Sequence, residues 1–100
     1  GVAIQMEGDP SDAALDAVWE TLHATRPTAI NLRWALDEMR RVLKPLPPAE
    51  RAEAAYKRAA EIADEDVGLN RAIGENGLAI IKQIAARKAP GETVNILTHC

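Results

Sequence analysis

Apolar residues recur three or four positions apart along most of the chain, which is the spacing of one face of an α-helix. Residues 1–7 have the pattern of a helix that ends near Gly8. A second helix is predicted from Asp9 to about Ala24, with Asp9 as its N-cap and Pro10 at its first position. Its apolar residues at helical spacing are Leu15, Val18, Trp19 and Leu22.

A third helix is predicted to begin at residues 25–27, where a proline breaks the second one. Trp19 and Trp34 are both expected in the core. The prolines of residues 45–48 predict a short, stiff connection to the next helix. The apolar stripe of the third helix consists of Leu32, Ala35, Leu36, Met39, Val42 and Leu43.

The pattern is strongly helical again from Ala49 to about Val67, and Gly68 or Gly74 is expected to interrupt it. Charged residues four positions apart predict a solvated face on this segment. A further helix is predicted over residues 75–87, and because it has little polar face, we expect it to be buried on most sides. The predicted apolar side of the segment before it carries Ala52, Ala55, Tyr56, Ala59, Ile62 and Ala63.

Residues 94–98 have the only convincing strand pattern, after a turn predicted at residues 90–91. A single strand cannot form a sheet, because its backbone groups need partners. We therefore expect the partners of residues 93–98 to come from outside this chain. The predicted fold class is mainly α: a helical N-terminal domain over residues 1–91, truncated at its start, followed in residues 92–100 by the first strand of an absent α/β domain. The residues expected to be buried against that strand are Leu78, Ile81 and Ile84.

Composition narrows the range of partners. With 47% hydrophobic and 27% charged residues the chain is globular in type, and 3% aromatic residues suit packed helices better than a β-sandwich. The formal charge of −3 and a pI near 5.3 argue against nucleic acid or an anionic membrane as partner, since both require a basic patch. No apolar run approaches the roughly 20 residues of a membrane span. The single cysteine excludes an internal disulfide and fits a reducing compartment, so we expect a cytoplasmic protein.

Cys100 is the first candidate for chemistry, because it follows an apolar strand pattern and sheets of α/β proteins bind ligands at the carboxyl ends of their strands. The alternative is a small buried hydrophobic residue. His99 is adjacent, but successive side chains of a strand point to opposite faces, so the two cannot form a catalytic dyad if the strand persists. His23, His99 and Cys100 have no metal-ligand spacing, and we expect no metal site.

Arg26 is the second candidate. If Pro27 starts a helix, the free N–H groups of that helix point back toward Arg26, and a guanidinium beside them favours a phosphate. The alternative is an ordinary surface arginine between two helices. The chain has no glycine-rich phosphate loop or dinucleotide fingerprint.

Three segments together resemble the 5-methylthioribose-1-phosphate isomerase family. Residues 24–36 begin Ala-Thr-Arg-Pro-Thr-Ala-Ile-Asn-Leu and end Trp-Ala-Leu, and residues 96–100 read Ile-Leu-Thr-His-Cys. Residues 70–77, Asn-Arg-Ala-Ile-Gly-Glu-Asn-Gly, are a looser match between them. The three segments occur in the order of the family with compatible spacing, and the resemblance extends over nearly the whole chain.

The resemblance implies an aldose–ketose isomerase of methionine salvage, which converts 5-methylthioribose 1-phosphate to 5-methylthioribulose 1-phosphate without metal or cofactor. It implies that Cys100 is the catalytic cysteine and Arg26 a ligand of the substrate phosphate. An aspartate of a Rossmann-like domain outside this chain would be the companion acid or base, so the 100 residues alone are expected to be inactive. The transfer between C2 and C1 is of a proton or, in a competing scheme, a hydride. The resemblance also implies a homodimer.

Two other functions remain open. A related isomerase could act on ribose 1,5-bisphosphate or another 1-phosphorylated pentose. A non-catalytic relative would be a regulatory subunit of the exchange factor for a translation initiation factor, which shares the fold. Cys100 behind Ile-Leu-Thr-His and the sequence Asn-Leu after Arg-Pro-Thr favour the isomerases.

Overall fold

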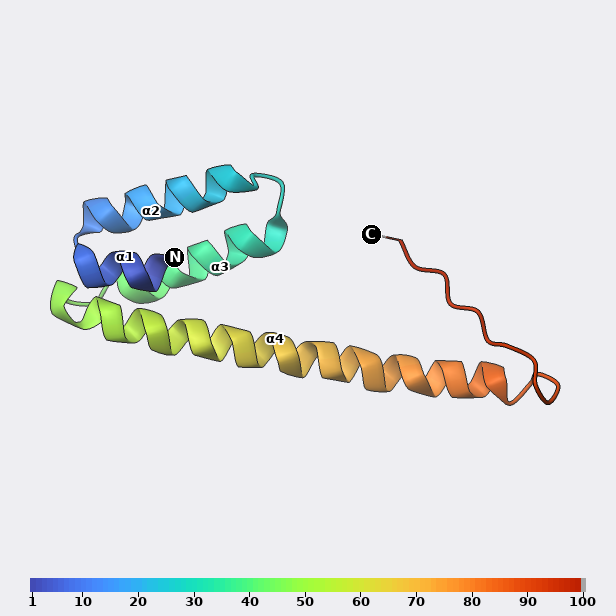
Figure 1. The fold of residues 1–100 in the computed structure, drawn as a ribbon. Helices are drawn as coiled ribbons and strands as arrows, with labels where there is room; N and C mark the ends of the chain where they lie inside the picture. The colour runs from blue at the N-terminus through green and yellow to red at the C-terminus, as the bar shows by residue number, and fades with distance from the viewer. Residues whose placement is uncertain (100) are drawn as a thin grey trace. The chain divides into compact units, whose positions relative to one another are not determined.

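The computed structural model describes residues 1–99, which form four α-helices (Figure 1). These are α1 (Val2–Gly8), α2 (Asp12–Thr25), α3 (Ile30–Leu43) and α4 (Pro48–Ala85). The chain divides into two compact units, Gly1–Asp64 and the part from Glu65 onward, and α4 contributes to both. The predicted fold class, mainly α, is confirmed. None of the helices in residues 1–99 has the length and hydropathy of a membrane span.

The start of α2 is set by Ser11 rather than by Asp9. The Ser11 hydroxyl accepts a hydrogen bond from the backbone N–H of Ala14 at 3.2 Å, which makes Ser11 the N-cap. The Asp9 carboxylate instead accepts from the Ser11 N–H at 3.0 Å, two residues along the chain. The predicted cap at Asp9 is therefore wrong by two residues, and Pro10 lies outside the helix. The predicted end of α1 near Gly8 is confirmed.

The predicted start of the third helix at residues 25–27 is also wrong. Arg26 ends α2, and residues 26–29 form a turn in which the Ala29 N–H donates to the Arg26 carbonyl at 3.0 Å. Helix α3 begins only at Ile30, after Ala29 as N-cap, and no side chain caps it. A proline at position 27 fits this turn as well as it fits a helix start, because both need a φ near −65°.

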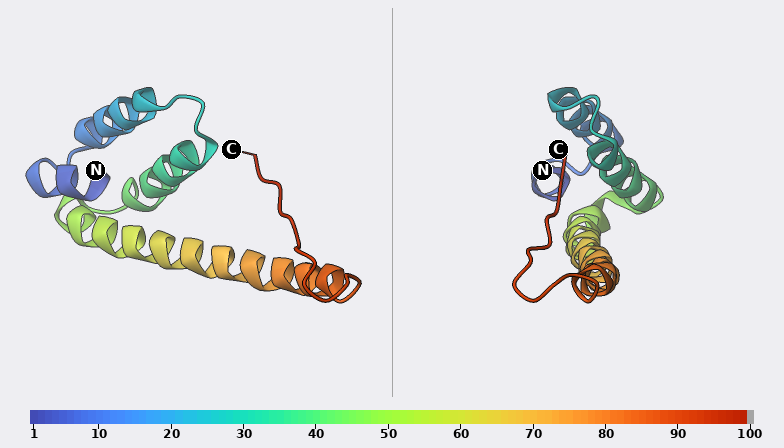
Figure 2. Two further views of the ribbon diagram at one scale, coloured as in Figure 1. Left: turned by 45° about the vertical axis from the view of Figure 1, so that its right-hand side comes forward. Right: turned by 90° about the vertical axis from the view of Figure 1, so that its right-hand side faces the viewer.

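The core of the first unit lies between α1, α2, α3 and the first turns of α4 (Figure 2). The predicted stripe on α3 is confirmed at its centre, where Leu36 and Met39 are buried. Trp19 packs against the core, but Trp34 is 50% exposed because it lies two residues from Leu36 and so on the opposite side of α3. The side chains with almost no exposure are Met6, Leu15 and Leu43.

A buried arginine joins two connections of this unit. Arg51, in the first turns of α4, is 4% exposed. Its guanidinium donates to the carbonyls of Pro10 at 2.8 Å, Leu46 at 3.1 Å and Lys44 at 3.2 Å, and it forms an ion pair with Asp12 at 2.6 Å. Pro10 precedes α2, and the other two carbonyls belong to the connection between α3 and α4. One side chain therefore holds the α1–α2 connection against the α3–α4 connection.

Helix α4 is continuous over 38 residues, so the interruption expected at Gly68 or Gly74 is wrong. A glycine inside a helix costs about 1 kcal/mol relative to alanine but keeps its backbone hydrogen bonds, and the helix-forming residues on both sides continue the helix. Along its first part the predicted apolar side is confirmed at Ala55, which is fully buried, but Tyr56 is 46% exposed.

The unit from Glu65 onward contains the rest of α4 and an irregular segment. The predicted turn at residues 90–91 is confirmed: Gly91 has a φ of 83°, and the Glu92 N–H donates to the Ala89 carbonyl at 3.0 Å. Residues 93–99 are neither helical nor paired as a strand within the described part of the chain. The expected burial of Leu78, Ile81 and Ile84 is wrong, because Leu78 is 47% and Ile84 43% exposed and Ile81 is only partly buried. The helix over residues 75–85 is likewise exposed, not buried on most sides.

We predict that Arg51→Ala destabilises the chain by about 2–4 kcal/mol, because it leaves three carbonyls and a carboxylate without their charged donor. Urea denaturation of the 100-residue chain followed by circular dichroism measures the change. Arg33→Ala is the matched control, since Arg33 forms only an exposed ion pair with Asp37 at 3.7 Å and should change stability by less than about 0.5 kcal/mol. Equal effects of the two substitutions would contradict the role assigned to Arg51.

Candidate functional site

Arg26 lies at the exposed turn between α2 and α3. Its backbone N–H donates to the His23 carbonyl at 3.2 Å, and its own carbonyl accepts from Ala29. Within residues 1–99 the guanidinium has neither a hydrogen bond nor an ion pair with a protein group. Helix α3 starts at Ile30, so its free N–H groups begin four residues after Arg26. A helix that started at Pro27, as the sequence suggested, would have placed them directly after Arg26.

A cluster of polar and aromatic side chains connects the middle of α2 to α3. The Trp19 indole N–H donates to the Asp37 carboxylate at 2.9 Å, and the His23 ring stacks on Trp19 with 4.8 Å between the ring centres. The Arg40 guanidinium lies 5.6 Å from the Trp19 ring and forms an ion pair with Asp16 at 2.5 Å. The contacts of Asp16 and Trp19 hold the middle of α2 against α3, whereas the stacking of His23 on Trp19 stays within α2.

The sequence pattern predicted a core position for Trp19 and indicated no role for His23. Their spacing of four residues on one helix could have indicated the stacked pair, but nothing in the sequence identified Asp37 and Arg40 as their partners on α3. The His23 Nε2 atom is buried and has no hydrogen-bond partner among the described residues.

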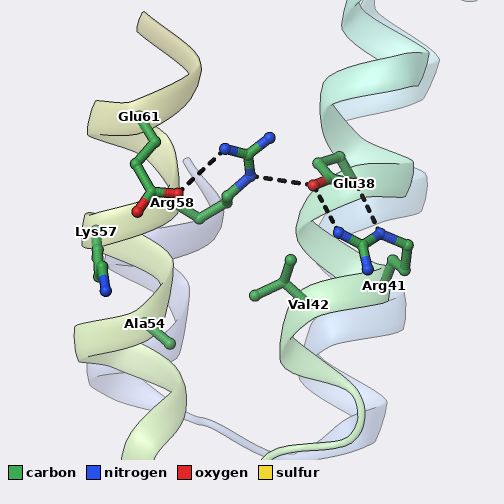
Figure 3. Close-up of a pocket in the computed structure, with 7 residues that line it drawn as sticks. All are labelled: Glu38, Arg41, Val42, Ala54, Lys57, Arg58 and Glu61. Carbon is green, nitrogen blue, oxygen red and sulfur yellow. Dashed lines mark hydrogen bonds and ion pairs between the residues drawn. The ribbon is translucent and has the colours of Figure 1, made fainter. Parts of the chain in front are cut away.

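A hollow of about 460 Å³ lies between α3 and α4 within the first unit (Figure 3). Glu38 on α3 is central to it: its carboxylate accepts from Arg41 at 2.8 and 2.9 Å and from the Arg58 Nε on α4 at 3.0 Å. Arg58 also donates to Glu61 at 3.1 Å. The hollow is lined by Glu38, Arg41, Val42, Ala54, Lys57, Arg58 and Glu61.

The ion pairs of this hollow determine its electrostatics. Hydrogen bonds from Arg41, and with them the charges of Arg41 and Arg58, lower the pKa of the Glu38 carboxyl from 4.5 to about 2. At neutral pH Glu38 is therefore ionised and compensates the arginines beside it, which leaves it unsuited to donate a proton. The Glu38–Arg58 ion pair beside the hollow links α3 to α4.

The matching family model, described as the initiation factor 2 subunit family, spans residues 6–100. The chain belongs to this family.

Methylthioribose-1-phosphate isomerases are among the curated proteins most similar to this family member. The protein of that name from Brucella anthropi is 74% identical and that from Rhizobium meliloti 73% identical, each over all 100 residues and 28% of its own length. A third, from Cereibacter sphaeroides, is 66% identical over all 100 residues and 27% of its own length. The chain thus spans little more than a quarter of the length of these relatives. No solved structure matches it.

The resemblance inferred from the three sequence segments is confirmed by these comparisons. The roles of individual residues in this family member remain predictions. Arg26 is located at the turn after α2, and Cys100 lies outside the described residues. His99 is exposed in the irregular segment. Residues 1–99 contain no group of three histidine, cysteine, aspartate or glutamate side chains that could hold a metal ion.

We predict that the Glu38 carboxyl of the 100-residue chain titrates with a midpoint at about pH 2, well below its ordinary value of 4.5. Because the folded-state pKa is lowered, the stabilisation from this carboxylate is complete above about pH 5 and is lost as the pH falls toward 2. Carbon-detected NMR of the side-chain carboxyl measures the midpoint. Arg41→Ala should move it back toward 4.5, and a midpoint near 4.5 in the unsubstituted chain would show that the ion pairs do not form.

Proposed function

We propose that the protein carrying this chain is an aldose–ketose isomerase of methionine salvage, which converts 5-methylthioribose 1-phosphate to 5-methylthioribulose 1-phosphate. The observation that carries the proposal is the identity of 74% and 73%, over all 100 residues, with two proteins named methylthioribose-1-phosphate isomerase. The three sequence segments that resemble this enzyme family lie within that matched length and add specific motifs to the overall identity.

The substrate places a particular demand on the site. Phosphate blocks the anomeric carbon, so the sugar has no free aldehyde, and its ring must open before a hydrogen moves from C2 to C1. A group that exchanges protons with the sugar is needed, and we assign this role to Cys100, whose thiol titrates closer to neutral pH than a hydroxyl. The companion acid or base belongs to a Rossmann-like domain outside these 100 residues. One proton-exchanging group is insufficient, so the 100-residue chain alone is expected to be inactive.

Arg26 is assigned to the substrate phosphate. Its guanidinium is exposed and forms no ion pair within residues 1–99, so its hydrogen-bond donors are free for a phosphate, which guanidinium groups bind through paired hydrogen bonds. The turn that carries Arg26 connects α2 to α3, and the Trp19–Asp37 hydrogen bond and the Arg40–Asp16 ion pair join these two helices.

The same proposal includes the domain organisation, the oligomeric state and the cellular location of the protein. Residues 1–91 would be the helical N-terminal domain and residues 92–100 the first strand of the Rossmann-like domain. The protein would act as a cytoplasmic homodimer without metal or cofactor. An isomerase specific for ribose 1,5-bisphosphate is the nearest alternative, and comparison of turnover on the two sugar phosphates distinguishes them.

A second candidate is a non-catalytic subunit of the exchange factor for a translation initiation factor, which the description of the matching family favours. The relatives that match all 100 residues at 66–74% identity are named as isomerases, which supports catalysis instead. Isomerase turnover by the protein at the length of those relatives decides between the two.

We predict the effect of Cys100→Ser in a protein that has the full length of the isomerase relatives. The substitution should keep substrate binding but lower kcat by a factor of about 100 or more, the range for loss of an acid or base. A coupled assay of isomerisation measures kcat, and calorimetry measures binding. The serine is nearly the same size as the cysteine, so a purely structural cysteine would tolerate it with a modest change in kcat. Near-normal turnover would therefore remove Cys100 from the chemistry.

Arg26→Ala in the same protein should weaken substrate binding about 10- to 100-fold, the loss of one guanidinium–phosphate contact. Arg26→Lys should restore part of the affinity, since it keeps the charge but loses the paired donors. Arg87→Ala serves as the control, because Arg87 is also exposed but lies outside the three segments of resemblance. Unchanged binding in Arg26→Ala would identify Arg26 as an ordinary surface residue.

A further inference from the structure

The part of α4 from Leu69 to Ile84 has a solvent-exposed apolar face. Leu69, Ile73, Ile80 and Ile84 are separated by four, seven and four residues, so they follow one side of the helix. Leu69, Ile73 and Ile80 are 65%, 70% and 60% exposed. Leu78 and Ile81 extend the apolar surface to about half the circumference of the helix. The opposite side carries charged residues such as Arg71 and Lys82.

Two glycines lie within this face. Gly74 and Gly77 fall between the rows of large apolar side chains, and a Cβ atom at either position would meet no atom within 4 Å. Each glycine costs the helix about 1 kcal/mol relative to alanine, and the described chain gains no contact in return. Gly68 is nine residues before Gly77, which is two and a half turns, and so lies on the opposite side of α4.

Such a surface is unfavourable in water. Each of these leucine and isoleucine side chains would gain roughly 1.5–3 kcal/mol on full burial. An apolar patch over half of a helix is the mark of an interface rather than of an ordinary surface. Within the unit from Glu65 onward, the described residues leave it exposed.

We propose that the face of α4 defined by Leu69, Ile73, Ile80 and Ile84 is an intramolecular docking surface, covered by the part of the protein that its relatives have beyond these 100 residues. The chain spans only 28% of the length of those relatives, so a protein of their length has further polypeptide about two and a half times the size of this chain. A covalently attached segment has an effective concentration in the millimolar range, far above that of a second copy in dilute solution. The inference rests on the protein having the length of its relatives and is independent of its substrate.

The glycines indicate how the attached segment approaches. The face is about 24 Å long, enough for about four helical turns or one strand of that segment to lie along it. At Gly74 and Gly77 the surface of the helix is reduced to backbone, so another backbone can approach more closely there than over the isoleucines. The isoleucines on either side would then pack around the approaching segment.

Thiol labelling tests the proposal. Ile73→Cys and, as matched control, Lys82→Cys are made in a Cys100→Ser background, both in the 100-residue chain and in the protein of full relative length. The two positions are nine residues apart, so they lie on opposite sides of α4. The rate of reaction with a maleimide is measured for each. We expect Ile73→Cys to react at least 100-fold more slowly in the longer protein, and Lys82→Cys to react at similar rates in both.

Three results would overturn the proposal. Equal rates for Ile73→Cys in the two proteins mean that the face stays free. Protection in the 100-residue chain that grows with protein concentration means that a second copy covers it. Protection of Lys82→Cys as strong as that of Ile73→Cys in the longer protein means that all sides of α4 are covered, not the apolar face in particular.

Glycine substitutions give a second, independent measurement. In the longer protein Gly77→Ala should lower the Tm by about 3 °C or more, because the added methyl group holds the docked segment away. Gly68→Ala should leave the Tm unchanged or raise it, since it removes backbone freedom without adding a contact. In the 100-residue chain both substitutions should raise helix content. A Gly77→Ala variant that stabilises the longer protein would show that nothing approaches the helix at this point.

Discussion

The arrangement of the first unit depends on the buried guanidinium of Arg51. Removing a charged group from water is costly, and the cost is offset only when nearly every donor has a partner. Here three backbone carbonyls from the α1–α2 and α3–α4 connections, and the carboxylate of Asp12 at the start of α2, provide those partners. Because the carbonyls belong to the chain outside the helices, Arg51 constrains how α1, α2 and α3 can be placed around their shared core.

The core and the cluster on its outer side hold together α2 and α3, the two helices on either side of the candidate phosphate ligand. Met6, Leu15 and Leu43 are buried between the helices, and Trp19 extends from that packing to the Asp37 carboxylate on α3. The turn that carries Arg26 therefore connects two helices that pack against each other. In this arrangement an exposed cationic side chain projects from a short turn between two packed helices, which suits the binding of a charged group on a small substrate.

The two parts of α4 differ in how their apolar residues are used. In the first unit Ala55 is fully buried and Arg58 joins α3 through Glu38, so this part of the helix belongs to the packed domain. From Leu69 onward the apolar residues are larger and more exposed, and glycines take positions where alanine would stabilise an isolated helix. Local helix stability would favour alanine at the glycine positions and polar residues at the exposed apolar positions. Sequences that conflict with local stability in this way are common at functional surfaces.

Local pattern by itself determined the helical class, the end of α1 near Gly8, the apolar stripe of α3 and the turn at residues 90–91, because helical periodicity and turn chemistry are encoded in neighbouring residues. The motif around Arg26 likewise indicated the family through the order of its residues alone. Only the tertiary structure decided which of two plausible caps starts α2, where α3 begins, and that α4 passes through its glycines without a break. It also decided burial. Trp34 and Ile73 are as apolar as many core residues, but burial requires a partner across the space they face, and that partner is specified by residues far away in the sequence or in another segment of the protein.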